Sequence, residues 1–107
     1  MSQILEAIQI VAPLIKELSI NDVAVTIADR QYCIDFIRSK SVPQLVNKGD
    51  IIPDGTVVKE CMDKNKKIIR KVPKEVLGFP YIASGMPVVE NGEIVGAISF
   101  VTPLERQ

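Results

Sequence analysis

Asn91-Gly92 constrains the fold of this chain most strongly, because the pair lies between two apolar runs with the character of strands. A two-residue hairpin loop needs positive φ at both central positions, and asparagine and glycine tolerate that conformation best. The pair therefore predicts an antiparallel hairpin between residues 80–89 and the run that begins at Glu93. In this register Glu90 pairs with Glu93.

The hairpin register also assigns alternate residues to two faces of the sheet. One face carries Ile82, Ser84, Met86, Val88, Val95, Ala97, Ser99 and Val101, and the other carries Tyr81, Ala83, Gly85, Pro87, Gly96, Ile98, Phe100 and Thr102. Gly85 and Gly96 contribute no side-chain volume to the second face. The space beside them suits either a closely packed helix, which we favour, or a ligand.

An amphipathic helix is expected over residues 2–18, where apolar residues recur at spacings of three and four. Pro13 removes one hydrogen bond of that helix and predicts a kink or a break into two shorter helices. The apolar stripe can pack on the chain's own sheet or on a second copy of the chain. In the second case it forms a homodimer interface that comprises Ile4, Ile8, Val11 and Ile15.

The remaining segments complete an α+β domain with a five-stranded antiparallel sheet and flanking helices. Further strands are expected at residues 23–28, 32–38 and 67–72, a second helix at residues 55–65, and a short helical turn at residues 73–77. Asp54 or Thr56 can cap the second helix. Residues 39–53 contain Pro43, Gly49 and Pro53 and lack any period, which indicates a long crossing segment.

The last residues of the sequence have the pattern of a helix start. Thr102 can accept the first free N–H, Pro103 suits the first helical position, and Glu105 can complete a capping box. We expect the natural polypeptide to continue beyond Gln107 or this helix to be completed by a partner. The expected organisation is one domain with a helix at 2–18, a core at 22–102 and the start of a further helix at 103–107.

The charge pattern favours neither nucleic acid nor membrane as a partner. The 107 residues carry thirteen basic and thirteen acidic side chains, and no apolar run is long enough to span a bilayer. Six basic residues lie between Lys64 and Lys74, and we interpret them as a solvated edge strand because no aromatic residues alternate with them. Cys33 and Cys61 are expected to be free thiols in a reducing cytoplasm.

Residue types argue against a cofactor, a metal and an enzyme. The chain contains no histidine, which is the usual ligand of haem, zinc and copper, and two isolated cysteines cannot hold an iron–sulfur cluster. Catalysis could use Cys33 as a nucleophile or Asp29 and Asp35 as acid–base groups. No histidine activates the thiol and no glycine-rich phosphate loop is present, so we expect no enzymatic activity.

A small organic or anionic metabolite remains as the expected ligand. Arg38 could pair with a carboxylate, while Tyr32, Tyr81 and Ser84 could donate or accept hydrogen bonds around it. Phe100 completes this set of candidate ligand-binding residues. The alternatives are that Arg38 is an exposed charge at a strand end and that Tyr81 is a core residue with its hydroxyl at the rim.

Three motifs give the chain a resemblance to a known family. They are Gly49-Asp50-x-x-Pro53-x-Gly55-Thr56, Gly78-Phe79-Pro80-Tyr81-Ile82-Ala83 and Pro87-x-x-x-Asn91-Gly92-x-x-x-Gly96. Over nearly its whole length the chain resembles the PAS-like, single-Cache sensory domains at the N-terminus of bacterial methyl-accepting chemotaxis receptors, especially the soluble receptors that lack membrane spans.

The resemblance implies a cytoplasmic, dimeric sensor that passes a ligand-induced rearrangement to a C-terminal coiled coil. Two alternatives remain open. One is a dimerisation module that binds no ligand, and the other is a PAS- or GAF-like regulatory domain of another signalling protein, such as a histidine kinase or a transcription regulator.

Overall fold

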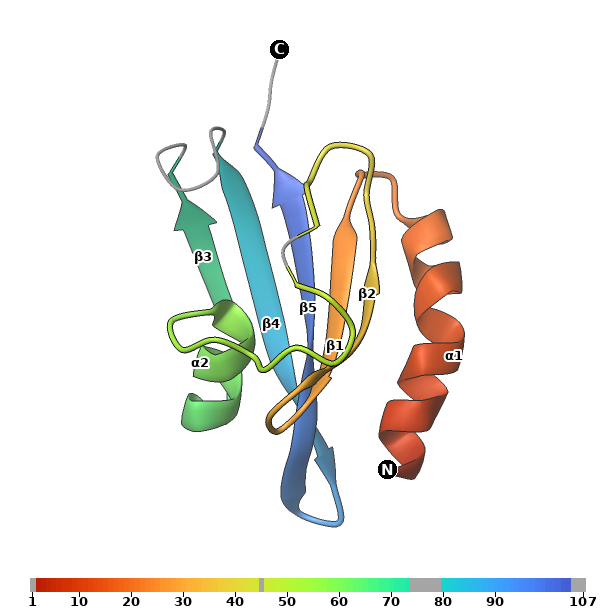
Figure 1. Cartoon of the computed structure of the whole chain (residues 1–107), viewed down its shortest axis with the longest axis vertical. Coiled ribbons are helices and arrows are strands. Elements are labelled where there is room, and N and C mark those ends of the chain that lie inside the picture. The colour runs from red at the N-terminus through yellow and green to blue at the C-terminus, as the bar shows by residue number, and fades with distance from the viewer. Residues whose placement is uncertain (1, 45, 74–79, 105–107) are drawn as a thin grey trace.

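The computed structural model describes residues 2–44, 46–73 and 80–104, and its elements follow the expected order along the chain (Figure 1). The helices are α1 (Gln3–Leu18) and α2 (Val57–Lys64), and the strands are β1 (Ala24–Asp29), β2 (Cys33–Ile37), β3 (Ile68–Val72), β4 (Tyr81–Glu90) and β5 (Glu93–Pro103). Within these residues the strands form a five-stranded antiparallel sheet in the order β2-β1-β5-β4-β3. The expected α+β class is confirmed.

The β4–β5 hairpin has the predicted loop, but its register shifts by one residue beyond the loop. Asn91 and Gly92 have φ values of 55° and 79°, and Glu90 pairs with Glu93. The register then changes between Val88 and Val89, so Val88 pairs with Gly96 rather than with Val95. This irregularity inserts one extra residue on β5, as a β-bulge does.

The bulge reverses the faces that we expected for β5. Ser99 pairs with Gly85 and Phe100 with Ser84, so Ser99 lies on the same face as Tyr81, and Phe100 lies on the other. The sequence-based register was therefore wrong for every β5 residue beyond the shift. Gly96 explains the local geometry, because a Cβ at this position would lie 2.0 Å from the carbonyl oxygen of Ala28 on β1.

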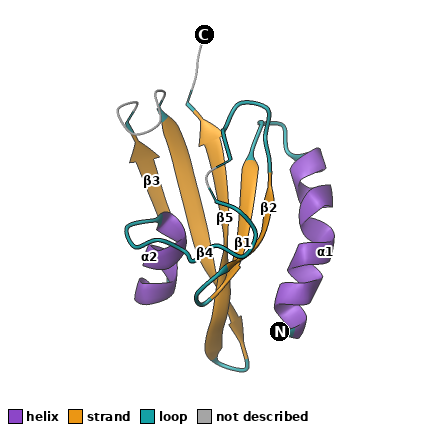
Figure 2. Cartoon of the chain, viewed as in Figure 1, coloured by secondary structure: helices purple, strands orange, loops and turns teal. Residues whose placement is uncertain are grey.

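Each face of the sheet has its own core. Figure 2 shows the helices in purple beside the orange strands of the sheet. Helix α2 lies over β3, β4 and β5, and α1 packs against β1 on the other face. The core on the α2 face includes Ala24, Ala28, Ile52, Val57, Cys61, Met62, Ile68, Tyr81, Ala83, Ala97 and Val101. The core on the α1 face includes Leu5, Ala12, Val23, Val25, Ile27 and Val88, with Ile8, Ile98 and Phe100 partly buried beside them.

Helix α1 begins after Ser2, whose hydroxyl accepts a 3.0 Å hydrogen bond from the backbone N–H of Leu5. The helix runs without a break through Pro13, so the expected division into two shorter helices is wrong. Pro13 is exposed. Pro13 therefore lies away from the buried positions Leu5 and Ala12, by which α1 packs on the sheet.

Helix α2 packs directly on the glycine of β4. Thr56, one of the two candidate caps, accepts a 3.2 Å hydrogen bond from the backbone N–H of Lys59. A Cβ on Gly85 would lie 2.8 Å from Cγ1 of Val57, so the close helix packing that we favoured is confirmed at this residue. The expected helical turn at 73–77 falls mostly outside the described residues.

The C-terminal end of β5 differs from the expected helix start. Pro103 still belongs to the strand, and the Thr102 hydroxyl donates a 3.1 Å hydrogen bond to the carbonyl of Asp22 instead of accepting one. The backbone N–H of Leu104 donates to the carbonyl of Pro80. Residues 105–107, where the output helix was expected to continue, lie outside the described residues.

Candidate functional site

A cavity of about 480 Å³ lies between α2, the segment that precedes it and the α2 face of the sheet. Its apolar walls include Ile52, Pro53, Val57, Val58, Val72, Tyr81, Ala83 and Val101. This volume falls within the range of small-molecule sites, which are mostly apolar with a few polar groups that orient the ligand. We therefore take this cavity as the candidate ligand site.

Two buried hydroxyl groups line the cavity next to each other. Thr26 on β1 pairs with Ser99 on β5, and their residues are only 6% and 4% exposed. In the described part of the chain neither side chain makes a hydrogen bond to another protein group. Ser99 lines the cavity because of the bulge, since the unshifted register would place it on the opposite face.

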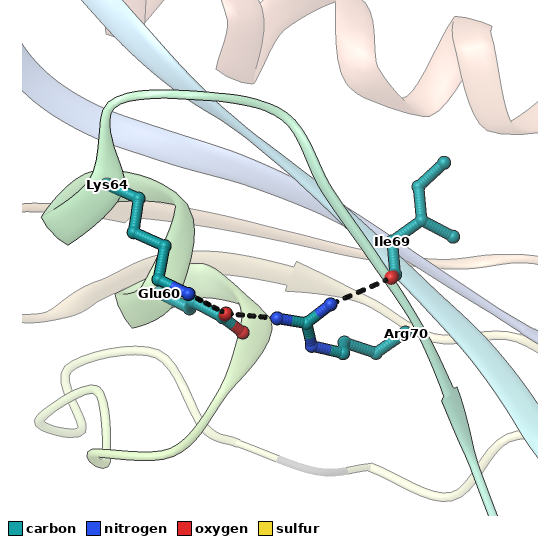
Figure 3. A network of polar contacts seen from close by, with 4 residues as sticks. All are labelled: Glu60, Lys64, Ile69 and Arg70. Atoms are coloured by element: carbon teal, nitrogen blue, oxygen red, sulfur yellow. Dashed lines mark hydrogen bonds and ion pairs between the residues drawn. The ribbon is translucent and has the colours of Figure 1, made fainter.

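The charged residues in the described cavity lining come from α2 and β3. Oε2 of Glu60 on α2 accepts a 2.9 Å hydrogen bond from Nζ of Lys64 and a short one from Nη2 of Arg70 on β3 (Figure 3). Nη1 of Arg70 donates to the carbonyl of Ile69. The Lys64 hydrogen bond, together with Arg70, lowers the pKa of Glu60. This network joins α2 to the edge strand beside the cavity.

Of the five residues predicted to bind a ligand, Tyr81 lines this cavity. Its side chain is buried, and burial raises its pKa. Ser84 and Phe100 pair with each other on the α1 face, because the bulge moved Phe100 away from Tyr81. A shift of one residue in the register therefore places Tyr81 and Phe100 on opposite faces of the sheet.

Tyr32 and Arg38 lie elsewhere in the described structure. Tyr32 is exposed and lines a different hollow with Gln31, Ile51 and Lys59. Arg38 follows the end of β2 and is exposed, as the alternative interpretation expected. The structure therefore does not gather the five predicted residues into one site, and a role for any of them in binding stays a prediction.

Sequence reasoning missed Thr26 and Ser99. Thr26 was detectable, because it is the one hydroxyl residue in the apolar run of residues 23–28. Ser99 was assigned to the wrong face. Its true position depends on a bulge that the local sequence does not reveal.

The residues considered for catalysis are either buried in the core or hydrogen-bonded to the backbone. Cys33 and Cys61 are buried free thiols, and burial raises the pKa of each to about 11. Oδ1 of Asp29 accepts hydrogen bonds from the backbone N–H groups of Gln31 and Tyr32, and Oδ1 of Asp35 accepts one from Phe36. The thiols are poor nucleophiles at neutral pH, and both carboxylates hold backbone groups in place.

Helix α1 uses only part of its apolar surface to pack on the sheet. Leu5 and Ala12 are buried, and Ile8 is partly buried beside them. The other three predicted interface residues, Ile4, Val11 and Ile15, are about 40% exposed. The exposed apolar residues of α1 also include Ile10, Leu14 and Leu18. Packing on the chain's own sheet is thus confirmed, and a second apolar surface remains on the helix.

The prediction of an edge strand is confirmed for part of the basic cluster, whereas Lys64 belongs to α2, Lys66 and Lys67 precede β3, and Lys74 lies outside the described residues. Strand β3 is the edge strand next to β4, and Arg70 and Lys71 are exposed on it. Arg70 is paired with Glu60 within the chain. Lysine and arginine side chains on an edge strand discourage pairing with other chains.

In the described residues, helices α1 and α2 on a five-stranded antiparallel sheet, with a cavity beneath α2, form an α+β fold that is similar to that of solved chemoreceptor ligand-binding and GAF domain structures. Over 98% of its length the chain is 33% identical to the Bacillus subtilis (strain 168) protein named "Putative sensory transducer protein YfmS". The chain spans 37% of the length of that relative. No protein-family model matches the chain.

Solved structures with little sequence identity share the fold. The C-terminal domain of a Vibrio cholerae "putative transcriptional regulator" has a TM-score of 0.69 at 12% identity and covers 96% of this chain and 84% of its own. The ligand-binding domain of the Pseudomonas aeruginosa amino acid chemoreceptor PctC, in complex with GABA, has a TM-score of 0.54 at 16% identity. The match covers 98% of this chain and 45% of the PctC chain.

A third structure, the GAF domain/HD domain protein of Geobacter sulfurreducens, has a TM-score of 0.57 at 18% identity and covers 98% of this chain and 78% of its own. Among the described residues, neither helix has the length and apolar character needed to cross a membrane. The names of the Bacillus subtilis relative and of the PctC structure describe a sensory transducer and a chemoreceptor.

Proposed function

We propose that this chain is the small-molecule-sensing domain of a chemotaxis-type signal transducer. The ligand binds in the cavity beneath α2 and changes the arrangement of the sheet and the terminal segments. A coiled-coil output beyond Gln107 receives this change. The observation that carries the proposal is the cavity of about 480 Å³, whose lining contains two buried hydroxyls without protein partners in the described chain.

The path from the cavity to the output runs along β5. Ser99 and Val101 line the cavity, and the next residue, Thr102, donates a hydrogen bond to the carbonyl of Asp22. Asp22 lies between α1 and β1. A ligand that displaces β5 therefore acts at once on the C-terminal end of the chain and on the connection that follows α1.

Self-association through α1 is part of the proposal. The exposed side of the helix carries Ile4, Val11 and Ile15, with Leu14 between the last two. An apolar helix surface of this kind is suited to a second copy of the same helix. The domain functions in this proposal as a homodimer in the cytoplasm, where its thiols stay reduced, and it carries out no catalysis.

The neighbours of the fold favour a second candidate function. The Vibrio cholerae regulator and the GAF domain/HD domain protein match this chain with TM-scores of 0.69 and 0.57, and both cover most of their own chains. A regulatory sensor of a different signalling protein would use the same cavity with another output. A dimerisation module without a ligand would leave the cavity unused.

Thermal unfolding in the presence of a broad compound panel tests the sensing function. Organic acids, amino acids, nucleotides and neutral metabolites are each added at millimolar concentration. A true ligand at a hundred times its Kd stabilises the fold by about 2.7 kcal/mol and raises the melting temperature. Absence of stabilisation by every compound contradicts sensing and favours the dimerisation module.

Two neighbouring substitutions control for the site. Ala83→Leu fills part of the cavity, because Ala83 lines it, whereas Ser84→Leu adds the same side chain on the α1 face. The first variant is expected to lose stabilisation by the ligand and the second to keep it. Equal stabilisation of both variants would place the ligand elsewhere.

A further inference from the structure

We propose that the cavity selects small molecules with an apolar body and an uncharged hydrogen-bonding group, such as an alcohol, a ketone or a primary amide. The hydroxyls of Thr26 and Ser99 hold that group. This inference rests on the proposed sensing function and specifies the chemical class of its ligand. It departs from the carboxylate that the sequence suggested for Arg38.

The hydroxyls of Thr26 and Ser99 are buried and can still accept or donate hydrogen bonds to a ligand. Both residues are more than nine-tenths buried and line the cavity, and neither side chain has a hydrogen-bond partner in the described chain. A buried hydroxyl without a partner is unfavourable, because it loses its hydrogen bonds to bulk water. A polar atom of a ligand can restore those bonds.

Thr26 and Ser99 lie opposite each other on neighbouring strands. Thr26 and Ser99 are direct partners in the β1–β5 register. Side chains in such positions have Cβ atoms about 5 Å apart, so one ligand group can contact both hydroxyls. A hydroxyl can donate and accept, and the pair can therefore bind a ketone oxygen, an alcohol or an amide.

The charged residues of the cavity lining lie apart from the two hydroxyls in the sheet register. Within the described lining, the basic residues Arg70 and Lys71 are exposed, and Arg70 is paired with Glu60. The nearest residues on the same face of β4 and β5 are Ala83, Gly85, Ala97 and Val101, none of which carries a charge. An ionised carboxylate beside Thr26 would lose its hydration without gaining a counter-charge.

A set of compounds with one ring tests the inference. Cyclohexanol, cyclohexanone and cyclohexanecarboxamide carry uncharged groups, whereas cyclohexanecarboxylate and cyclohexylamine carry charges at pH 7. Each compound is titrated by calorimetry and by thermal unfolding. We expect the three neutral compounds to bind at least about tenfold more tightly than the two ions, a ratio that corresponds to 1.4 kcal/mol.

Variants at the hydroxyls separate specific binding from simple filling of the cavity. Thr26→Val keeps the size of the side chain, and Ser99→Ala removes a single oxygen. Each variant is expected to weaken cyclohexanol binding by roughly tenfold, whereas Ser84→Ala, on the opposite face, leaves it unchanged. Melting temperatures without ligand establish that each variant is folded, and Ser99→Ala suffices if Thr26→Val is unstable.

The outcomes distinguish this inference from the proposed function. Tighter binding of the carboxylate, or equal cyclohexanol binding by wild type and both hydroxyl variants, overturns the uncharged class while sensing stands. The variants are also applied to any compound found in the broad panel. A charged compound that binds independently of both hydroxyls overturns the inference too, and the absence of any binding compound contradicts the sensing function itself.

Discussion

The Thr102 hydroxyl donates a hydrogen bond of 3.1 Å to the backbone carbonyl of Asp22, across 80 residues of sequence. The contact joins the end of the last strand to the connection between α1 and β1. The same aspartate accepts backbone hydrogen bonds from Lys40 and Ser41 through its carboxylate. Three separate parts of the chain therefore meet at Asp22.

Thr102→Val is expected to lower the free energy of unfolding by about 1 kcal/mol, because it removes one hydrogen bond and preserves the shape of the side chain. Urea unfolding followed by circular dichroism measures the loss. Thr56→Val serves as a comparison, since it removes the cap of α2 and should cost a similar amount without affecting the C-terminal end. A Thr102→Val protein as stable as wild type contradicts a structural role for this contact.

Asp22 makes the fold sensitive to acid. Partial burial raises the pKa of Asp22, but the hydrogen bonds from Lys40 and Ser41 outweigh it, so the pKa lies below the ordinary value of 3.8. A lowered folded pKa gives stability that is present above pH 3.8 and lost as the pH falls through the folded value. Asp22→Asn should cost about 1 kcal/mol at pH 7.

The measurement for Asp22 is urea unfolding of both proteins between pH 7 and pH 3. The difference between wild type and Asp22→Asn should shrink toward the acid end. A difference that is constant over the whole range shows that ionisation of Asp22 contributes nothing to stability.

The two buried glycines of the sheet should respond differently to a methyl group. A Cβ on Gly96 would lie 2.0 Å from the backbone oxygen of Ala28, whereas a Cβ on Gly85 would meet the side chain of Val57 at 2.8 Å. Backbone moves less readily than a side chain, so we expect Gly96→Ala to cost about 3 kcal/mol and Gly85→Ala about 1 kcal/mol. Equal losses in urea unfolding would contradict the tight β1–β5 contact.

The two thiols should be nearly unreactive in the folded protein. Burial raises the pKa of Cys33 and Cys61 from 9.0 to about 11, which lowers the thiolate fraction at pH 8 roughly a hundredfold. Iodoacetamide labelling followed by mass spectrometry should give slow modification of the native chain. In about 6 M guanidinium, which unfolds the chain, modification of both thiols should be rapid. Fast labelling of native Cys33 would revive the enzyme hypothesis.

The exposed side of α1 predicts weaker self-association after truncation. Ile4→Ala with Val11→Ala removes apolar atoms of residues that are about 40% exposed. The proposed dimer should therefore dissociate at higher protein concentrations than the wild-type dimer does, while the fold persists. Sedimentation velocity over a concentration series measures the effect. Leu5→Ala is the contrasting variant, because Leu5 is 1% exposed and its truncation should cost about 3 kcal/mol of stability instead.

Unchanged sedimentation of the Ile4→Ala, Val11→Ala protein would contradict a dimer through α1. A Leu5→Ala protein that dissociates without losing stability would show that Leu5, and not the exposed side of the helix, lies at the interface.

Local signals predicted the parts of the fold that depend on neighbouring residues. Asn91-Gly92 gave the hairpin loop, and Thr56 with the apolar positions that follow it gave α2 and its buried face. The bulge near Val88 was not predictable from the hairpin alone. It is coupled to the approach of Gly96 to Ala28, and that contact involves a strand almost seventy residues earlier in the sequence.

The candidate site depended on the same long-range contact. Tyr81 precedes the shift and was placed on the correct face, whereas Ser99 and Phe100 follow it and exchanged faces. Thr26 carries a local signal, but its significance appears only when Ser99 lies opposite it. Pairings between distant strands therefore decided which polar groups line the cavity.

The strand order β2-β1-β5-β4-β3 puts the last strand in the middle of the sheet. During synthesis, β1 and β2 can form a hairpin early, and β3 can pair with β4 later, but neither half can join the other until β5 has left the ribosome. Pairings over such long separations close slowly, because a large loop must be ordered before any contact compensates for it. Nascent chains that stop before Glu93 should thus remain open to proteases, and those that include Pro103 should become resistant in one step.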